Sequence, residues 1–203
     1  MWCDPSLPSG LGGLALCWLG ALFPLGPAAV ERAFPVEGPS DYVAAHHDYP
    51  AVDVFADCGT PVGSPVDGVV LEVGRVDRWE DSTDRGRHRG GKFFSVEGDD
   101  GVRYYGSHLG RVRRGLAPGD VVAAGDTLGR VGRTGSAAGT PCHLHVGLSP
   151  VCEGAGDWAV RRGVVSPYRF LRSWERGGNL SPVRAVGRWE RRNACPGGDP
   201  VGP

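Results

Sequence analysis

Short apolar runs recur between residues 51 and 149, and Gly, Pro, Asp or Ser separates each run from the next. The runs are AVDVFA (51–56), GVVLEVG (68–74), KFFSVEG (92–98), GVRYYGSHL (101–109), DVVAAG (120–125), TLGRVG (127–132) and HLHVGLS (143–149). Val and aromatic residues in runs of this length are typical of strands, and the separating residues are typical of tight turns. Asp99, Asp100 and Gly101 stand between two runs and predict a hairpin turn. The pattern therefore predicts an all-β domain.

The pattern is different at the N-terminus. Residues 5–30 carry no charge, and residues 11–25 are almost continuously apolar. Such a segment, followed by small residues, is typical of an export signal, and an uncleaved membrane anchor is the alternative. We interpret residues 1–30 as a signal peptide or membrane-proximal leader and expect an exported protein, extracellular or associated with the cell wall.

The pattern changes again after the last strand-like run. Ser166-Pro167 predicts the start of a short helix, with Tyr168, Leu171 and Trp174 on one face. From there the chain becomes polar and rich in Gly and Pro. We therefore expect a folded domain over residues 31–176 and a loose tail over residues 177–203.

One segment inside the domain is long and highly charged. Residues 75–91 carry nine charges in seventeen positions and predict an exposed loop between strands. A solvated insertion is the interpretation we favour. The alternative is that this loop forms a wall of a groove, which Trp79 would then line.

The overall charge excludes some classes of function. The chain has 22 basic and 23 acidic residues, for a net charge of −1. It therefore lacks the basic character of a nucleic-acid-binding protein or of a polybasic membrane-surface protein. We expect membrane contact through the N-terminal segment only, and a monomer.

Five of the six histidines fall into three short motifs, which are HHDYPAVD (46–53), GSHL (106–109) and HLH (143–145). Residues two apart in a strand point to the same face, so His143 and His145 direct two imidazoles into one space. Two imidazoles and the carboxylate of Asp53 would leave the fourth position of a tetrahedral zinc ion open, as in hydrolytic sites. The motifs therefore predict a metal site with additional histidines for acid–base chemistry.

These three motifs, in this order, resemble those of the lysostaphin- and LytM-type zinc endopeptidases of peptidase family 23, which cut peptide cross-links in peptidoglycan. The segments GTPVGSPVDGVV (59–70) and PGDVVAAGD (118–126) resemble the connecting strands of the same family. The resemblance covers residues 40–150. It implies an antiparallel β-sandwich of the barrel-sandwich hybrid type, with a duplicated hybrid motif and a short C-terminal helix. It also implies a zinc metalloendopeptidase that acts on peptidoglycan peptides.

Carried over to this sequence, the resemblance implies one Zn²⁺ per chain with Asp53 and His145 as ligands. A histidine of the first motif is the third ligand. The family most often spaces this His and Asp by three residues, whereas His47 and His46 precede Asp53 by five and six intervening residues. We choose His47 because an even offset keeps both side chains on one face of a regular strand. His46 remains the alternative.

The resemblance implies His108 and His143 as the two catalytic histidines. A neutral histidine, which we assign to His143, takes a proton from the attacking water. His108 then stabilises the oxyanion or passes a proton to the leaving amine, and the sequence also allows the two roles to be exchanged.

Two other classes of protein deserve comparison. A catalytically inactive family member would bind and activate another wall hydrolase, but such a member would be expected to have lost ligands. A biotinyl or lipoyl carrier domain has a similar strand pattern and needs a lysine at a hairpin tip. The only lysine, Lys92, lies instead at the start of an apolar run.

The cysteines predict disulfides. Without the leader, four cysteines remain, an even number in an exported protein. We favour a disulfide between Cys142 and Cys152, which flank the last strand. The rival pairing joins Cys58 to Cys142 and requires the strands of Asp53 and His145 to be antiparallel.

Overall fold

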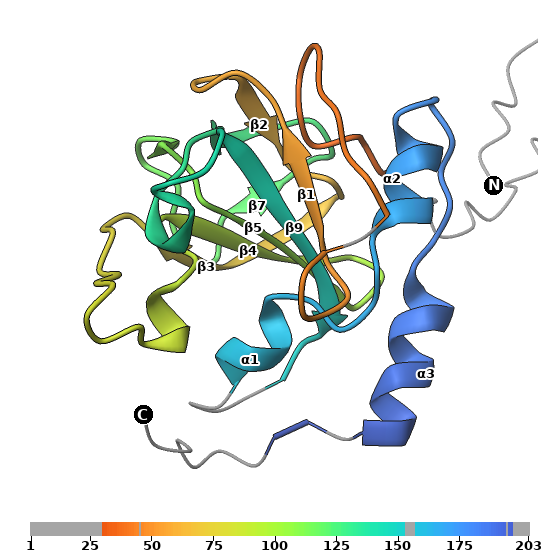
Figure 1. Cartoon of the computed structure of the whole chain (residues 1–203). Helices are drawn as coiled ribbons and strands as arrows, with labels where there is room; N and C mark the ends of the chain where they lie inside the picture. The colour runs from red at the N-terminus through yellow and green to blue at the C-terminus, as the bar shows by residue number, and fades with distance from the viewer. Residues whose placement is uncertain (1–29, 45, 153–156, 194, 197–203) are drawn as a thin grey trace, which may run out of the picture.

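The computed structural model describes residues 30–44, 46–152, 157–193 and 195–196 (Figure 1). Its strands form two antiparallel sheets, one with six strands in the order β1-β9-β5-β4-β3-β7 and one with three in the order β2-β8-β6. The strands are β1 (Val52–Phe55), β2 (Pro61–Gly63), β3 (Gly68–Gly74), β4 (Phe93–Gly98), β5 (Val102–Ser107), β6 (Arg111–Val112), β7 (Val121–Val122), β8 (Thr127–Arg130) and β9 (His143–Pro150). The expectation of an antiparallel β fold with few helices is confirmed.

Both sheets contribute to one hydrophobic core. Val54 of β1 and Leu144 of β9 belong to the same buried cluster as Val62 of β2 and Leu128 of β8. In β1, Val52 and Val54 are fully buried while Asp53 between them points to the opposite face. One face of the large sheet is thus used for packing, and its other face is left for polar side chains.

The hairpin turn between β4 and β5 forms where the sequence predicts it. The amide of Gly101 donates to the carbonyl of Gly98 at 2.8 Å. Gly101 has a φ of +73°, in the left-handed region that glycine adopts without steric cost. The side chain of Asp100 accepts a hydrogen bond from the amide of Val102 at 3.2 Å, which fixes the turn further.

The helices are short. They are the 3₁₀ turns η1 (Gly86–His88) and η2 (Gly135–Ala137) and the α-helices α1 (Trp158–Arg161), α2 (Tyr168–Trp174) and α3 (Val183–Asn193). Helix α2 confirms the predicted short helix, with Leu171 and Trp174 buried.

Helix α3 lies in the segment that we expected to be loose, and that expectation is wrong for its residues. It runs along the outside of the domain, and Val186 is buried against the core. A disulfide between Cys152 and Cys195 attaches the end of this segment to the residues that follow β9. Burial of one apolar face and a covalent link together hold the helix in place.

The second disulfide joins Cys58 to Cys142. The favoured pairing of Cys142 with Cys152 is therefore wrong, and the rival pairing is confirmed. Cys142 and Cys152 lie at opposite ends of β9, an eight-residue strand. At about 3.3 Å per residue such a strand separates its ends by ~25 Å, far beyond the reach of a disulfide. Cys58 follows β1, the antiparallel partner of β9, and therefore lies next to Cys142.

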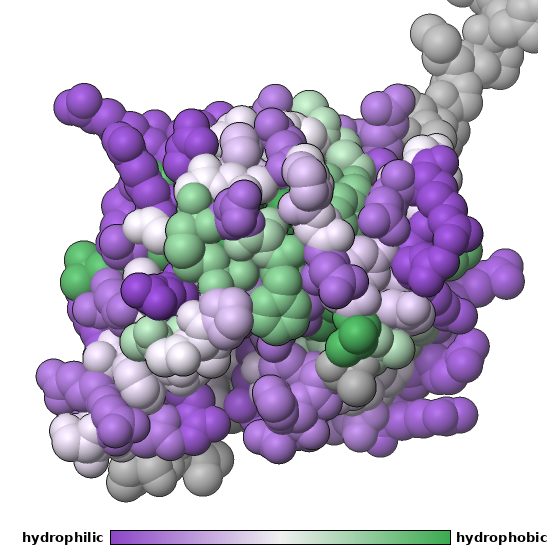
Figure 2. Space-filling view, turned by 45° about the horizontal axis from the view of Figure 1, so that its top comes forward, coloured by the Kyte–Doolittle hydropathy of each residue, from purple (hydrophilic) through white to green (hydrophobic). Residues whose placement is uncertain are grey.

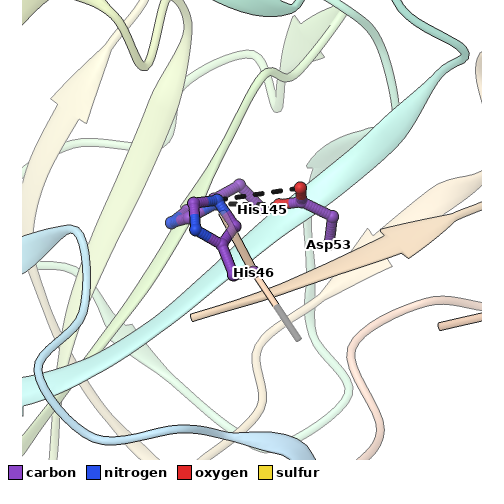
Figure 3. A group of neighbouring side chains, drawn as sticks. All are labelled: His46, Asp53 and His145. Atoms are coloured by element: carbon purple, nitrogen blue, oxygen red, sulfur yellow. Dashed lines mark hydrogen bonds and ion pairs between the residues drawn. The ribbon is translucent and has the colours of Figure 1, made fainter. Parts of the chain in front are cut away.

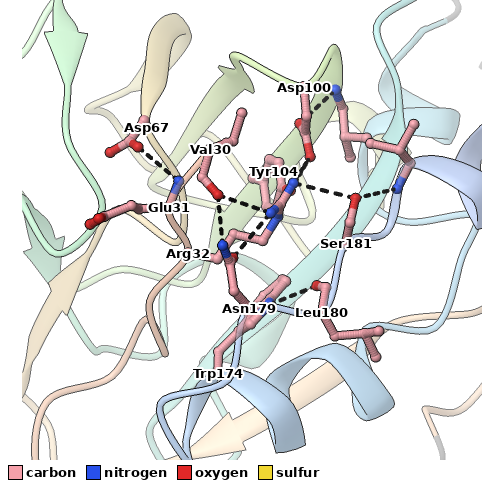
Figure 4. A network of polar contacts seen from close by, with 12 residues as sticks. Val30, Glu31, Arg32, Asp67, Asp100, Tyr104, Trp174, Asn179, Leu180 and Ser181 are labelled. Atoms are coloured by element: carbon pink, nitrogen blue, oxygen red, sulfur yellow. Dashed lines mark hydrogen bonds and ion pairs between the residues drawn. The ribbon is translucent and has the colours of Figure 1, made fainter. Parts of the chain in front are cut away.

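A buried ion pair closes the fold at its N-terminal edge (Figure 4). Arg32 pairs with Asp100 of the β4–β5 turn, and both side chains are about 5% exposed. The guanidinium also donates to the hydroxyl of Tyr104 at 3.2 Å and to the side-chain oxygen of Asn179 at 3.1 Å. This network joins three segments that are distant in the sequence.

Polar and charged side chains cover most of the face shown in Figure 2, around a smaller apolar area. Within the described residues, no helix is both long enough and apolar enough to cross a membrane. The predicted leader over residues 1–30 falls almost entirely outside the described part of the chain.

Candidate metal and catalytic site

The neighbouring strands β1, β9 and β5 carry most of the residues of the candidate site. Asp53 of β1 lies directly opposite His145 of β9, and Ser107 of β5 lies opposite His145 on the other side. His143 lies two residues before His145 and points to the same face, as strand alternation predicts. His108 directly follows β5. The register of the sheet thus brings the strand-borne residues of all three sequence motifs together.

Asp53 lies at the centre of this group. Its Oδ1 is 2.9 Å from Nδ1 of His145 and 3.9 Å from Nε2 of His143, and its Oδ2 is 3.7 Å from Nε2 of His46. Burial alone raises the pKa of a carboxyl group. The close contact with the ring of His145 and the other surrounding imidazoles outweigh burial and lower the pKa of Asp53 to about 2, so the group is an anion at neutral pH.

The hydrogen bonds of His145 show which of its ring nitrogens faces Asp53 without a proton. Nε2 lies 2.8 Å from the carbonyl oxygen of Arg162. A carbonyl only accepts, so Nε2 carries a proton and donates it. In the neutral ring Nδ1 is then bare, and it faces the carboxylate oxygen of Asp53. Two acceptors that face one another in this way fit a cation held between them.

His46 completes a set of three candidate metal ligands. One atom each from His46, Asp53 and His145 lies within 4.8 Å of the others, and Figure 3 shows the three side chains directed toward one another. Nδ1 of His46 is buried with no hydrogen-bond partner among the described residues. Two imidazoles and a carboxylate are typical ligands of Zn²⁺, and the carbonyl of Arg162 orients one imidazole as metal sites require. The residues therefore fit a zinc ion.

The structure brings His46, rather than the expected His47, to Asp53 and His145. The expectation relied on strand alternation, but β1 begins only at Val52, so alternation does not extend back to the two histidines. His47 is exposed and lies at the rim of the same cavity. Burial and the neighbouring ring of His145 lower the pKa of His46, which favours the neutral ring that binds metal.

The two predicted catalytic histidines lie beside the ligand set. The ring centroid of His108 is 4.9 Å from that of His143 and 5.8 Å from that of His145. Nδ1 of His108 is 2.8 Å from the carbonyl oxygen of Thr134, and Nδ1 of His143 is 2.9 Å from that of Pro141. Each ring therefore donates through Nδ1 and, when neutral, holds a bare Nε2.

The environment of His108 keeps it neutral. Burial, with the nearby rings of His145 and His143, lowers the pKa of His108 to about 3. His108 also has a φ of +63°, which is uncommon for a residue other than glycine and costs on the order of 1 kcal/mol. The fold maintains this backbone conformation at the site, where it directs the ring toward His143.

A cavity of about 270 Å³ opens over these side chains. Gly86, Arg87, Arg89 and Gly90 of the charged loop line it, so this part of the loop forms a wall of the cavity. The structure thus supports the interpretation of this loop that the sequence favoured less. Trp79 is not among the lining residues, and its indole N–H lies instead near Asp84. His88 is likewise not among the lining residues.

The cavity residues that sequence reasoning missed include Tyr49, Trp158 and Arg162. The ring centroid of Tyr49 is 4.4 Å from that of His46, and its hydroxyl is 3.5 Å from Nε2 of His145. Burial raises the pKa of Tyr49 to about 12, so its hydroxyl stays protonated. Tyr49 lies within the first histidine motif, which was a usable signal, whereas no pattern marks Trp158 or Arg162.

The known proteins that this chain resembles are peptidases. The model of peptidase family M23 matches residues 47–155, more than half of the chain. A curated relative, the L-Ala--D-Glu endopeptidase of Bacillus subtilis (strain 168), is 28% identical over 162 residues. That match covers 72% of this chain and 44% of the relative.

Two solved structures show the same fold. One, from Ruminococcus gnavus and provisionally assigned as a glycyl-glycine endopeptidase, is 27% identical with a TM-score of 0.55, covering 73% of this chain and 62% of that one. The other is the antimicrobial peptidase lysostaphin from Staphylococcus simulans, 26% identical with a TM-score of 0.51, covering 71% and 53%. This chain therefore matches less than two thirds of the length of each of these proteins.

Proposed function

The chain belongs to peptidase family M23, and we propose that it is a zinc-dependent endopeptidase that hydrolyses peptide bonds of bacterial peptidoglycan. The observation that carries this proposal is the group of His46, Asp53 and His145, in which a bare imidazole nitrogen faces a carboxylate. The peptidase names of the similar proteins support the same class of reaction.

We propose that His46, Asp53 and His145 hold one Zn²⁺ per chain, with His46 in place of the expected His47. When bound, Zn²⁺ with three such ligands polarises a carbonyl and lowers the pKa of a coordinated water toward about 7. The carbonyl of Arg162 keeps His145 in the tautomer that binds metal. The hydroxyl of Tyr49 adds a second contact to the same ring.

His143 and His108 would move the protons. Each is fixed through Nδ1 and presents a bare Nε2, the form that accepts a proton. We assign His143 as the base that takes a proton from the attacking water, because its Nε2 lies 3.9 Å from Asp53. Neutral His108 has no Nε2 proton to offer an oxyanion. The proton that His143 takes from the water would pass to the leaving amine, and Nε2 of His108 could accept and relay it, because the two ring centroids lie 4.9 Å apart.

The alternative of an inactive member that activates another hydrolase is not supported. Such a protein would be expected to have lost part of its ligand set or both proton carriers, and here all five groups lie around one cavity. Cys58–Cys142 and Cys152–Cys195 fit an oxidising compartment. We therefore propose an exported enzyme that acts on peptidoglycan as a monomer.

Digestion of purified peptidoglycan tests the proposal. The chain is stripped of metal with a chelator, supplied again with Zn²⁺, and incubated with the wall in both forms. We expect new amine ends from the zinc-supplied protein only, and no new reducing sugar ends. Reducing ends without amine ends would indicate a glycosidase, and amine release unaffected by the chelator would exclude a metal-dependent mechanism.

A further inference from the structure

The side chain of Arg162 lines the cavity with no described partner for its charge. Its backbone carbonyl holds His145, but its guanidinium makes no ion pair or hydrogen bond among the described residues. The Nε atom is buried with no hydrogen-bond partner. A half-buried cation whose N–H groups find no acceptor is costly, unless a ligand supplies the acceptor.

Aromatic rings hold this guanidinium in position. Its central carbon lies 4.1 Å from the ring centroid of Tyr49 and 5.7 Å from that of Trp158. Cation–π contacts of this kind fix the plane of the group and leave its N–H edge free. A planar, pre-oriented edge of N–H donors matches the two oxygens of a carboxylate.

The backbone fixes where Arg162 stands. The next residue, Gly163, has a φ of +130°, and a Cβ there would lie 2.8 Å from the carbonyl oxygen of Pro50. The chain after α1 therefore passes tightly along β9 and places Arg162 over the first histidine motif. The ring of Tyr49 contacts both the guanidinium of Arg162 and the ring of His46.

The other arginines of the cavity differ from Arg162. Arg89 is paired with Asp84, and Arg161 is paired with Glu72 at 2.7 Å. Arg87 is exposed on the loop. Of the four arginines that line the cavity, Arg87 and Arg162 therefore have no acidic partner among the described residues. Arg162 is the less exposed of these two, so an anionic ligand would offset more of its burial cost.

From these observations we propose that Arg162 forms a carboxylate-binding subsite and selects peptides that carry a free carboxylate one or two residues from the cleaved bond. This inference rests on the proposed peptidase function and specifies its substrate class. A residue of extended peptide spans about 3.5 Å, so a carboxylate at that distance along the substrate reaches the guanidinium while the peptide bond lies over His143. An acidic stem peptide has this chemistry, and an oligoglycine bridge does not.

The test uses one peptidoglycan preparation in two forms, untreated or with its free carboxyl groups converted to amides by carbodiimide and ammonia. Release of amine ends is measured as kcat/KM for the zinc-supplied protein. We expect amidation to slow the wild type by about tenfold to a hundredfold, the range for loss of a hydrogen-bonded charge pair. Arg162→Gln should be slowed to a similar degree on untreated wall and should no longer distinguish the two forms.

Two variants serve as controls. Arg89→Gln should keep the wild-type preference, because Asp84 already neutralises that arginine. Arg162→Lys keeps the charge but loses the planar donor edge, and it should retain only part of the preference. Zinc content and the thermal unfolding midpoint of each variant show that the site and fold remain intact.

Three outcomes overturn the inference. The first is that the wild-type protein cleaves both walls equally fast. The second is that Arg162→Gln keeps the full preference, and the third is that Arg89→Gln alone abolishes it. In each case amine release still occurs, so the proposed peptidase function stands. Absence of amine release from both walls is the distinct result that rejects the proposed function and this inference with it.

Discussion

The disulfide between Cys58 and Cys142 should stabilise both the fold and the site, and the two effects can be separated. It joins residues 84 apart in sequence. In the chain-entropy treatment, closing a loop of this length lowers the conformational entropy of the unfolded chain. At 25 °C this loss stabilises the folded state by about 4.5 kcal/mol. Domains are typically stable by only about 5–15 kcal/mol, so removal of this bond should be a large perturbation.

The matched control is the disulfide between Cys152 and Cys195, which closes a separation of 43 residues. The same treatment gives about 4 kcal/mol for it. The two bonds therefore have similar entropic effects but lie at opposite ends of β9. Cys142 directly precedes His143, and its carbonyl accepts from Ala56 at 3.3 Å where β1 ends.

The double variants Cys58→Ser/Cys142→Ser and Cys152→Ser/Cys195→Ser should each lose several kcal/mol of unfolding free energy, measured by urea denaturation. Only the first should also lose activity per folded molecule, because it frees the end of β9 that carries His143. The reasoning is refuted if the first variant unfolds within about 1 kcal/mol of wild type, or if the control loses as much activity per folded molecule.

Three further predictions concern single residues. Asp100→Ala leaves Arg32 buried without its counter-ion and should lower the unfolding free energy, measured by urea denaturation, by about 3–5 kcal/mol. Removal of the Tyr104 hydroxyl, which donates to the same carboxylate, should lower it by less. His143→Ala should retain near-stoichiometric zinc by mass spectrometry while kcat falls by about two orders of magnitude, and loss of the metal would contradict its assignment as a base. Because the folded pKa of His108 lies below its unfolded value, the unfolded chain binds the extra proton between about pH 6.5 and 3. The metal-free protein should therefore lose stability as pH falls through that window, by up to about 1.4 kcal/mol per unit, and His108→Asn should flatten this slope; an unchanged slope would contradict the lowered pKa.

Strand-borne features were predictable because strand geometry is regular. The spacing of His143 and His145 predicts that both point to the same face of their strand, and the short apolar runs predict a β fold. The choice of His47 over His46 relied on strand parity, but the residues before Val52 lie outside β1, so sequence parity carries no information there. The same regularity, applied to the length of β9, would have excluded a disulfide between its two ends.

Helix α3 was predictable in principle. Ser181-Pro182 precedes it just as Ser166-Pro167 precedes α2, and Val183 and Val186 follow at helical spacing. The surrounding Gly and Pro obscured this signal. Arg162, in contrast, has no local signal, because its position depends on the tight passage of the chain along β9.

Zinc content of His46→Ala and His47→Ala, measured side by side, tests the central assignment most directly. The two variants remove the same chemical group from adjacent residues, so nonspecific effects on the fold are matched. We expect His46→Ala to lose most of its zinc and His47→Ala to retain about one ion per chain, since only the ring of His46 lies beside Asp53 and His145. Retention of zinc by His46→Ala together with its loss from His47→Ala would contradict the site described for this protein.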